Sequence, residues 1–497
     1  MSKILLKNGL LLDKSENLHQ AKKDLLIENN RIVKIADHID ESADEVIDCE
    51  GKIVSPGFID IHVHVFDGCP KLGIQPDPVG IEQGVTSLMD AGTAGPENFD
   101  QFIEEIVKPA KTRVFSAMNY SKMGLWVKPE GDSEDKWDID LAEKVYHEHE
   151  DIIVAIKARA SNSCVGKLGI VPIKAAKELA SRCGIPLYVH IGHALPLIED
   201  TLNVMQKGDI ITHTFHGKDN NVLDDNGQLK PETKAAIERG VKFDVGHGRE
   251  SFCFTTLQKA MKIGFYPDCV STDLHMKSYN HPVKSLAETM DKMVMLGISL
   301  EDTVADVTCN PAGMLHLKEL GSLKEGYLAD ITVFHTVEKE TLYTDSEGNQ
   351  MTGHFSIIPD MAIVDGNVYP CAYEEHLRNM EVIDTLVPKL VNTKTEYIED
   401  GKKYLLKILD FLSKNDVKFN ETTVIGLGSH VFGLISRIKD KEVMEDLGDS
   451  ALSELSEKAV DLAKKVSAMI EESEDAKLVS SETLLIAIHI QNAMTNL

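Results

Sequence analysis

Between residues 57 and 314 the chain alternates short apolar runs, rich in β-branched residues, with stretches of helical periodicity. The helical stretches include Ile173–Cys183 and Pro231–Gly240, in which apolar residues recur at three- and four-residue steps. The apolar runs are Phe58–Val65, Thr86–Met89, Arg113–Met118, Ile152–Lys157, Pro186–His190, Ile210–His213, Lys242–Val245 and Cys269–Asp273. Eight strands that alternate with helices predict an α/β protein with a (β/α)8 TIM barrel over residues 57–314, whose reactive groups gather at the C-terminal strand ends.

Strand-like runs also flank this central region. The early ones are separated by turn signals and indicate a small antiparallel sheet: Ile4–Leu6, Leu25–Glu28, Arg31–Ile35 and Val46–Ile47. A matching pattern returns in Ala329–Phe334 and Met361–Tyr369. We therefore expect residues 1–56 and 315–372 to pair as one β-sandwich domain, into which the barrel is inserted.

The character of the sequence changes beyond Tyr373. Apolar residues recur at helical spacing in four runs: Tyr404–Leu412, Thr423–Ile438, Ser450–Glu471 and Ser481–Met494. This pattern predicts a separate all-α domain over residues 373–497.

The charge of the chain narrows the range of partners. Its 497 residues include 52 Lys and Arg against 80 Asp and Glu, a net charge of −28, which disfavours nucleic acid and anionic membranes. The N-terminus lacks the apolar core of a secretory signal, and no run reaches the roughly 18 apolar residues of a spanning helix. The eight cysteines include no Cys-x-x-Cys pair and indicate reduced thiols. We expect a cytoplasmic protein that forms a homo-oligomer.

Side chains that can bind metal stand at the ends of five predicted strands: His62 and His64, Lys157, His190, His213 and Asp273. His62 and His64 are two residues apart in a strand, so both imidazoles face the same side and can bind one cation. Taken singly, each residue has an ordinary explanation. A lone histidine is more often a core group, a lysine reaches solvent, and Asp273 can cap the helix that follows it. Together they occupy one end of the barrel.

A bare ammonium at Lys157 is costly, because its charge lies in a low dielectric beside metal ligands. Reaction with carbon dioxide converts it to a carbamate, whose two oxygens can bridge two cations. We therefore expect two divalent ions, with carbamylated Lys157 bridging, His190 and His213 on one ion, and His62, His64 and Asp273 on the other. Zinc suits this set, and manganese, iron or cobalt are alternatives.

Such a centre predicts hydrolysis of an amide or ester bond. A hydroxide that bridges the two ions is the expected nucleophile, and the second ion polarises the carbonyl oxygen of the substrate. Asp273 touches this hydroxide and is the expected general base and acid, which takes the proton and passes it to the leaving group.

These residues stand in segments that resemble the amidohydrolase superfamily, specifically its dihydroorotase-like and deacetylase-like members. The matching segments are Pro56–His64, Ala155–Arg159, Leu187–His190, Ile211–His213, Ser271–Asp273, Thr308–Ala312 and Gly321–Asp330. The resemblance covers residues 1 to about 371. It implies the barrel, the metal centre and hydrolytic activity, and it says less about the substrate.

Polar residues near the predicted metals are candidates for substrate binding: Arg159, Asn162, His193, His216, His247 and His275. Arg159 can clamp a substrate carboxylate or form a structural ion pair. Dihydroorotases carry an arginine shortly after the first histidine pair, where this chain has Val65–Cys69. This favours deacetylation of an N-acyl amino acid or an acylated hydroxy acid. A cyclic amidohydrolase of the dihydroorotase or hydantoinase kind is one alternative, and a regulatory or scaffold protein with residual hydrolase activity is another.

The helical tail has a signal of its own. His430 precedes Arg437 by two helical turns, and His489 stands in an apolar run near the end. Residues 396–497 resemble the regulation domain (PRD) of sugar phosphotransferase systems, whose histidines accept phosphate from carrier proteins. The resemblance makes His430 and His489 candidate phosphoacceptors and a phosphocarrier protein a candidate partner. The alternatives are that His489 is a buried core residue, that Arg437 only pairs with a neighbouring acid, and that the domain serves self-association or docking.

Overall fold

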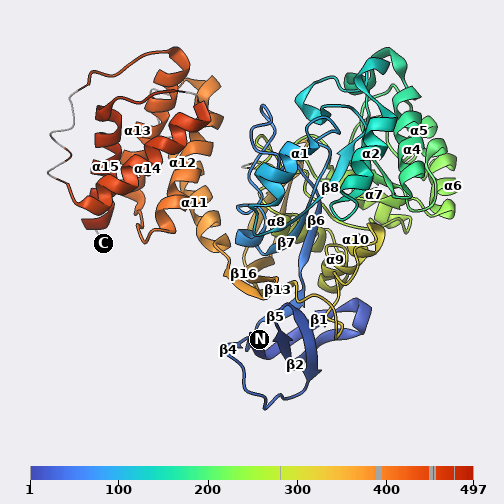
Figure 1. Ribbon diagram of the computed structural model, residues 1–497, viewed down its shortest axis with the longest axis horizontal. Helices are drawn as coiled ribbons and strands as arrows, with labels where there is room; N and C mark the ends of the chain where they lie inside the picture. Colours follow the sequence, from blue (N-terminus) through green and yellow to red (C-terminus); the bar gives the residue numbers. More distant parts are fainter. Residues whose placement is uncertain are drawn as a thin grey trace. The chain divides into compact units, whose positions relative to one another are not determined.

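Seven of the eight runs predicted as barrel strands form one parallel sheet in the computed structural model of the protein (Figure 1). They follow each other in chain order across the sheet as β6 (Phe58–Val63), β7 (Val85–Asp90), β8 (Arg113–Asn119), β9 (Ile153–Ala160), β10 (Leu187–Ile191), β11 (Ile210–Thr212) and β12 (Lys242–Phe243). Nearly all of their residues are buried, which explains why the sequence shows continuous apolar runs rather than alternation.

The eighth predicted run, Cys269–Asp273, is not a regular strand. Its ends nevertheless bridge to both edges of the sheet, because Cys269 pairs with Asp244 beyond β12 and Leu274 pairs with Val63 of β6. Asp273 turns the chain with a φ of 52°, in the left-handed region, and this interrupts the extended pairing. The result is a TIM-barrel-like parallel sheet whose C-terminal strand ends lie on one side.

Helices connect the strands of this sheet and continue after its last strand. They are α1 (Phe99–Phe102), α2 (Ile139–Glu148), α3 (Asn162–Val165), α4 (Val171–Cys183), α5 (Ile198–Val204), α6 (Pro231–Arg239), α7 (Phe254–Lys262), α8 (Leu286–Met295), α9 (Leu300–Ala305) and α10 (Cys309–Met314). The helix α4 packs on β9, with α2 beside it (Figure 1). It has Pro172 in its first turn and ends at Gly184 in the left-handed conformation, so its boundaries agree with the predicted helix.

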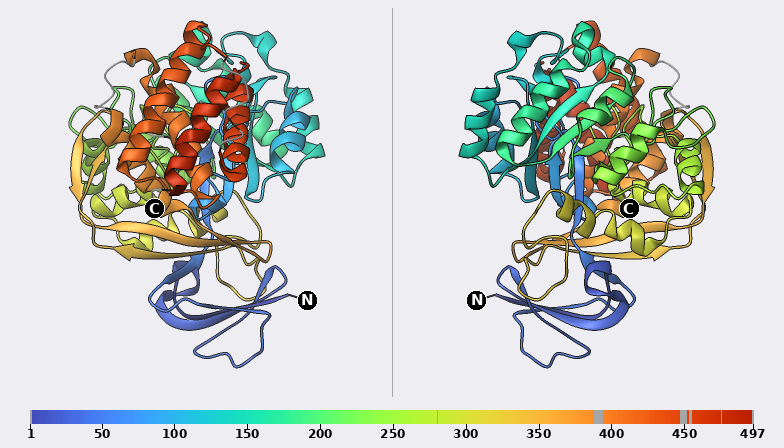
Figure 2. Two further views of the ribbon diagram at one scale, coloured as in Figure 1. Left: turned by 90° about the vertical axis from the view of Figure 1, so that its left-hand side faces the viewer. Right: turned by 90° about the vertical axis from the view of Figure 1, so that its right-hand side faces the viewer.

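The two flanking regions share a second sheet of eight strands (Figure 2). Its strands are β1 (Lys3–Asp13), β2 (Leu18–Glu28), β3 (Arg31–Ala36), β4 (Glu45–Asp48), β5 (Ile53–Pro56), β13 (Ile331–Val337), β16 (Ser356–Val364) and β17 (Asn367–Pro370). The expected pairing between the two flanking regions is present, since β5 lies between β1 and β13. The sequence suggested that the early strands form a purely antiparallel sheet. This is wrong, because β4 and β5 both pair with β1 in parallel.

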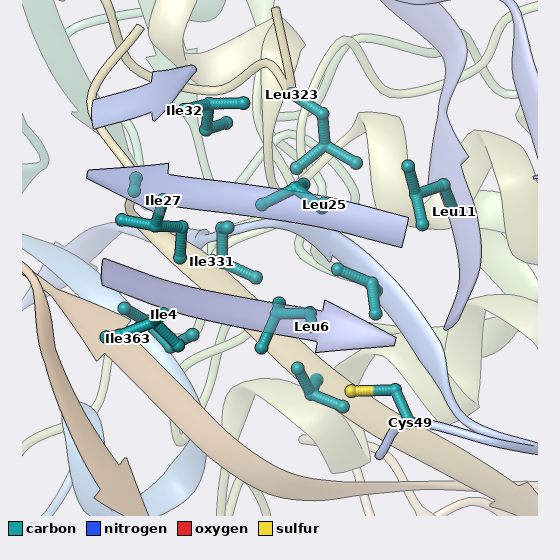
Figure 3. Packing of buried hydrophobic residues seen from close by; sticks show 13 residues of the cluster. Ile4, Leu6, Leu11, Leu25, Ile27, Ile32, Cys49, Leu323, Ile331 and Ile363 are labelled. Atoms are coloured by element: carbon teal, nitrogen blue, oxygen red, sulfur yellow. The ribbon is translucent and has the colours of Figure 1, made fainter. Parts of the chain in front are cut away.

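A core of aliphatic side chains holds this second sheet together (Figure 3). Leu6, Leu25 and Ile27 from the N-terminal strands lie with Ile331 and Ile363 from the late ones. A separate hairpin, β14 (Thr341–Thr344) and β15 (Gln350–Gly353), interrupts the late strands. A single residue, Gly57, separates β5 of this sheet from β6 of the parallel sheet, and its amide donates to the Asp330 carbonyl at 2.8 Å.

The chain divides into two compact units, residues 1–371 and 372–497. The second unit is helical as expected: α11 (Tyr373–Leu386), α12 (Ile398–Ser413), α13 (Glu421–Asp440), α14 (Glu457–Glu474) and α15 (Ser480–Thr495). The structure describes residues 2–279, 281–387, 394–446, 452, 455–474 and 476–495, so the predicted helix start at Ser450 and the chain end at Leu497 lie outside it. Within the described ranges, every helix is too short or too polar to cross a bilayer.

A buried carboxyl between α9 and α10 makes the stability of the fold depend on pH. Burial raises the pKa of Asp306 from 3.8 to about 7. Between pH 3.8 and pH 7 the folded protein keeps a proton on Asp306 that the unfolded chain has released, so the free energy of unfolding falls as the pH rises. Above pH 7 the full cost of burying the ionised carboxylate is present. Asp306→Asn keeps an oxygen for the Asn310 amide, which donates at 2.7 Å. We expect the variant to gain about 2–4 kcal/mol over wild type at pH 8 and much less at pH 4.5.

Denaturant unfolding at the two pH values measures this gain. The neighbouring Asp302→Asn is the control. The hydrogen bond from Lys14 lowers the pKa of Asp302, so loss of this carboxylate should destabilise the protein at neutral pH rather than stabilise it. An Asp306→Asn gain that is equal at both pH values would contradict the assignment.

Candidate metal centre

The six predicted metal-binding side chains come together at the C-terminal strand ends: His62 on β6 and His64 just beyond it, Lys157 on β9, His190 on β10, His213 after β11, and Asp273 in the bridging segment. Asp273 faces three imidazoles. Its Oδ1 lies 3.4 Å from Nε2 of His62 and 3.1 Å from Nε2 of His64. Its Oδ2 lies 3.8 Å from Nε2 of His213. One carboxylate thus shares a small space with three nitrogen donors.

His62, His213 and Asp273 form a group that can hold a metal ion, since one ligand atom of each lies within 4.8 Å of the other two. Nδ1 of His213 donates to the Gly246 carbonyl at 2.6 Å, so Nε2 carries the lone pair. This Nε2 is fully buried and finds no hydrogen-bond partner among the described residues. A buried nitrogen without a partner is unfavourable, and a divalent cation on its lone pair satisfies it. The donors of this group therefore fit a divalent metal ion.

The imidazoles of this group are neutral near pH 7, which metal binding requires. Burial lowers the pKa of His213 to about 3. It also lowers the pKa values of His62, His64 and His190 well below the usual range. His190 is the least enclosed of the four, and its ring centre lies 4.3 Å from that of His213.

Lys157 is fully buried beside these histidines. Its Nζ lies 3.2 Å from Nε2 of His62 and 4.5 Å from the ring centre of Tyr188. Burial lowers the pKa of Lys157 to about 7, so a large fraction of the side chain is a neutral amine at physiological pH. A neutral amine is the form that reacts with carbon dioxide, and the position next to His62 suits an added ligand.

Gly92 leaves the space that the Lys157 side chain fills. A Cβ at this position would lie 2.7 Å from Cβ and 2.6 Å from Cγ of Lys157, and the φ of +84° strains any other residue. The stem of Lys157 cannot swing away, because it is fixed on β9. We expect Gly92→Ala to lower the free energy of unfolding by about 1–3 kcal/mol and to reduce the bound metal per chain.

Chemical denaturation and metal analysis by mass spectrometry test this expectation. Gly264→Ala is the matched control, because Gly264 has a φ of +81° with nothing within 4 Å of the added Cβ. Both variants share the backbone strain, so a Gly92→Ala protein with the stability and metal content of Gly264→Ala would show that the contact with Lys157 is unimportant.

The predicted substrate-binding residues fall into two groups. Arg159 is already paired, because its guanidinium donates to both carboxylate oxygens of the buried Glu130, at 2.5 and 2.8 Å. This is the ion-pair alternative that the sequence left open. Asn162 and His193 are exposed at the same end of the sheet, where the backbone N–H of Asn162 donates to the backbone carbonyl of His193 at 3.0 Å.

The remaining histidines are more enclosed. The ring of His275 lies 6.1 Å from that of His64, and burial lowers its pKa to about 4. His216 is fully buried, and the Lys218 amide donates to its Nδ1 at 3.1 Å. Nε2 of His247 is already occupied, because Nζ of the buried Lys292 lies 3.1 Å from it.

Sequence reasoning missed the buried groups around the histidines. Thr212 Oγ1 lies 2.9 Å from Nδ1 of His62, and Thr93 Oγ1 lies 2.9 Å from Nδ1 of His64. Asp60 accepts from the Thr272 hydroxyl at 2.6 Å and from the Thr272 amide at 3.1 Å, which ties β6 to the bridging segment. For Thr212 and Thr272 the available signal was a position next to the end of a predicted strand, whereas Asp60 lies inside one.

In the second unit the two candidate phosphoacceptors are neighbours, with ring centres 5.8 Å apart. Nε2 of His430 lies 3.2 Å from the buried carboxylate of Glu482. Arg437 donates to both oxygens of the same carboxylate, at 2.9 and 3.0 Å. The partly buried His489 has its pKa lowered by burial, so its ring is neutral near pH 7.

Comparisons with known proteins agree with this geometry. A sequence model of the Amidohydrolase family matches residues 53–387, and one of the PRD domain matches residues 407–493. A deacetylase of Enterococcus faecalis is 36% identical over 364 residues, which are 72% of this chain and 98% of the relative. Among solved structures, an adenine deaminase has a TM-score of 0.71 and 36% identity over 74% of this chain and 100% of its own. A dihydroorotase has a TM-score of 0.69 and 32% identity, over 75% and 98%.

The parallel sheet with its cluster of histidines and a carboxylate defines a metal-dependent hydrolase. The chain belongs to the amidohydrolase family, and it carries a PRD domain at its C-terminal end.

Proposed function

We propose that the protein is a binuclear metal-dependent hydrolase of an amide or ester bond in a small molecule. The observation that supports this most directly is the Asp273 carboxylate, which lies 3.1–3.8 Å from Nε2 of His62, His64 and His213. Lone pairs and negative charge converge there in a buried space, as hydrolytic metal sites require.

Six residues would hold two divalent ions, with zinc the best fit to imidazole and carboxylate donors and manganese, iron or cobalt as alternatives. His62, His64 and Asp273 would bind one ion, His190 and His213 the other, and carbamylated Lys157 both. The ions would supply a water of lowered pKa and polarise the scissile carbonyl.

Asp273 is the proposed general base and acid. Its carboxylate is partly exposed, at 13% of the side chain, while the histidines His62 and His213 beside it are almost fully buried. It can therefore take a proton from the attacking water on one side and donate it to the leaving nitrogen or oxygen on the other.

The proposed reaction is deacetylation of an N-acyl amino acid or an acylated hydroxy acid. The relative from Enterococcus faecalis that carries the name deacetylase supports this choice. In the place where dihydroorotases carry an arginine, Val65 and Phe66 are fully buried and offer no charge to a ring substrate. Arg159, Asn162, His193, His216 and His275 are the proposed substrate-binding residues. Arg159 can use the guanidinium hydrogens that Glu130 leaves free.

Turnover by zinc-loaded protein across four substrate classes tests the proposal: N-acetyl amino acids, acetylated hydroxy acids, dihydroorotate and hydantoin rings, and adenine. Release of acetate from either of the first two is expected. Turnover of the rings alone would support a cyclic amidohydrolase, which the dihydroorotase structure favours. Turnover of adenine alone would point to the deaminase-like relative. Metal-loaded protein without turnover would support a regulatory or scaffold role.

We further propose the domain boundaries that the sequence suggests. Residues 57–314 would form a closed (β/α)8 barrel, with segment 269–273 as its eighth member. Residues 1–56 and 315–372 would form the β-sandwich, and residues 373–497 the helical domain, with a PRD core at about 396–497. We also propose that the chain self-associates as a homo-oligomer.

His430 and His489 are the proposed phosphoacceptors of the PRD domain. We expect a phosphocarrier protein with phosphoenolpyruvate and its kinase to transfer phosphate to at least one of them. The two rings are neighbours, and Arg437 binds the Glu482 carboxylate that His430 also contacts, so its guanidinium can stabilise the added phosphate. Mass spectrometry of the intact chain, with His430→Ala and His489→Ala variants, measures the transfer. His376, which contacts Asp410 at 2.6 Å in the same unit, is the control histidine. An unmodified wild-type chain would contradict the proposal.

A further inference from the structure

Two of the histidines at the metal centre rest on matching pairs of buried residues. Behind His64 lie Thr93 and Asp90, and behind His62 lie Thr212 and Asp244. Both threonines and both aspartates are fully buried. The two pairs come from different strand ends, β7 in the first case and β11 with the segment after β12 in the second.

The hydrogen bonds in each pair have a defined direction. The Asp90 carboxylate accepts the Thr93 amide at 2.7 Å, the Val65 amide at 2.9 Å and the Thr93 hydroxyl. Because an ionised carboxylate can only accept, we assign the single hydroxyl proton of Thr93 to Asp90. The Thr93 oxygen then has only lone pairs left, so it must accept the proton on Nδ1 of His64.

The same reasoning applies to His62. Asp244 accepts the hydroxyls of Tyr188 at 2.8 Å and Ser271 at 2.7 Å, together with that of Thr212. These donors favour the ionised carboxylate against the burial that raises its pKa. The Thr212 oxygen therefore accepts from Nδ1 of His62.

The third histidine shows the same outcome by a simpler route. Nδ1 of His213 donates directly to the Gly246 carbonyl at 2.6 Å. The same assignment in all three rings places the proton on Nδ1 and leaves the lone pair on Nε2, the atom that lies 3.1–3.8 Å from the Asp273 carboxylate. A common tautomer in three neighbouring rings is what a shared metal requires.

We propose that Asp90 and Asp244 are positioning residues, which act through Thr93 and Thr212 to hold His64 and His62 with the Nε2 lone pair directed at a metal ion. This inference rests on the proposed metal centre. It assigns to four residues outside the ligand set a part in metal affinity, and it predicts that the threonine hydroxyl, rather than the bulk of its side chain, is the essential group.

Substitutions that change only the hydroxyl separate these possibilities. Thr93→Val and Thr212→Val keep the shape of the side chain and remove the hydrogen bond, whereas Thr93→Ser and Thr212→Ser keep the hydroxyl. Thr303→Val is the matched control, because Thr303 in α9 is equally buried and its hydroxyl finds no partner among the described residues. Asp90→Asn tests the outer member of the first pair.

The readout is the dissociation constant for zinc, measured on metal-stripped protein by competition with a chromophoric chelator. We expect the two valine variants and Asp90→Asn to weaken zinc binding by roughly 10- to 100-fold, the range found for the outer partners of metal ligands. The serine variants and Thr303→Val should stay within about threefold of wild type by the same measure. The melting temperature of each metal-stripped variant shows whether it folds, and Asp90→Asn replaces Thr93→Val if the latter does not.

The outcomes distinguish the two levels of the proposal. Valine variants that bind zinc as wild type does would overturn the positioning role and leave the metal centre intact. Serine variants as weak as the valine variants would also overturn it, because the hydroxyl would then not be the group that matters. A wild-type chain that binds no zinc would overturn the proposed function itself.

Discussion

Asp273→Asn is expected to lower kcat by roughly 10²- to 10⁴-fold, the range that a positioned general base contributes. The amide keeps one oxygen near His62 and His64 but cannot accept a proton from water. The carboxylate reaches three imidazoles through two different oxygens, at 3.1 to 3.8 Å, so the change removes negative charge from the centre without removing its shape.

Steady-state kinetics with the substrate from the four-class test measures this effect, at zinc concentrations that saturate each protein. Asp306→Asn is the control, because it replaces a buried carboxyl of the same unit that lies outside the centre. If Asp273→Asn retained more than a tenth of wild-type kcat with full metal occupancy, another group would have to move the proton.

Lys157→Ala is expected to abolish binding of the metal pair, leaving at most one ion per chain and no measurable turnover. The side chain is the only buried cation beside His62 in the described structure, and its carbamate would supply the negative charge that two divalent ions share. Metal analysis together with anomalous scattering from crystals tests the ion count and the density at Lys157 at once.

Two comparisons sharpen this test. Lys292→Met removes another fully buried lysine and should leave the ion count unchanged. Removal of bicarbonate from the buffer during metal loading should lower the ion count of wild type and leave that of Lys157→Ala as it is. A Lys157→Ala protein with two ions and full activity would refute the assignment.

The sequence predicts the parallel strands well, because their residues are buried on both faces and the apolar runs are therefore continuous. It is less informative where pairing depends on distant segments. The parallel pairing of β4 and β5 with β1 cannot be seen in the short runs themselves. The left-handed turn at Asp273, which interrupts the eighth run, depends on contacts such as that between Thr272 and Asp60.

The same limit applies to the candidate site. Histidine, lysine and aspartate at strand ends are visible in the sequence, and the fold brings them together, while their binding of metal stays a prediction. Arg159 could not be assigned from sequence, because Arg159 lies on β9 and its partner Glu130 lies on a loop 29 residues earlier. Threonine and aspartate behind a histidine carry no pattern of their own, since such residues are common at strand ends.

The single residue between β5 and β6 has a consequence for protein engineering. β5 is paired on both sides within the second sheet, and the strand that carries His62 begins two residues after it ends. A truncation that starts near residue 57, intended as a minimal catalytic fragment, would remove β5. The N-terminal end of β6, the strand that carries His62, would then lose its attachment to the second sheet. We therefore expect a fragment that keeps this anchor to need the whole compact unit of residues 1–371, with the N-terminal strands included.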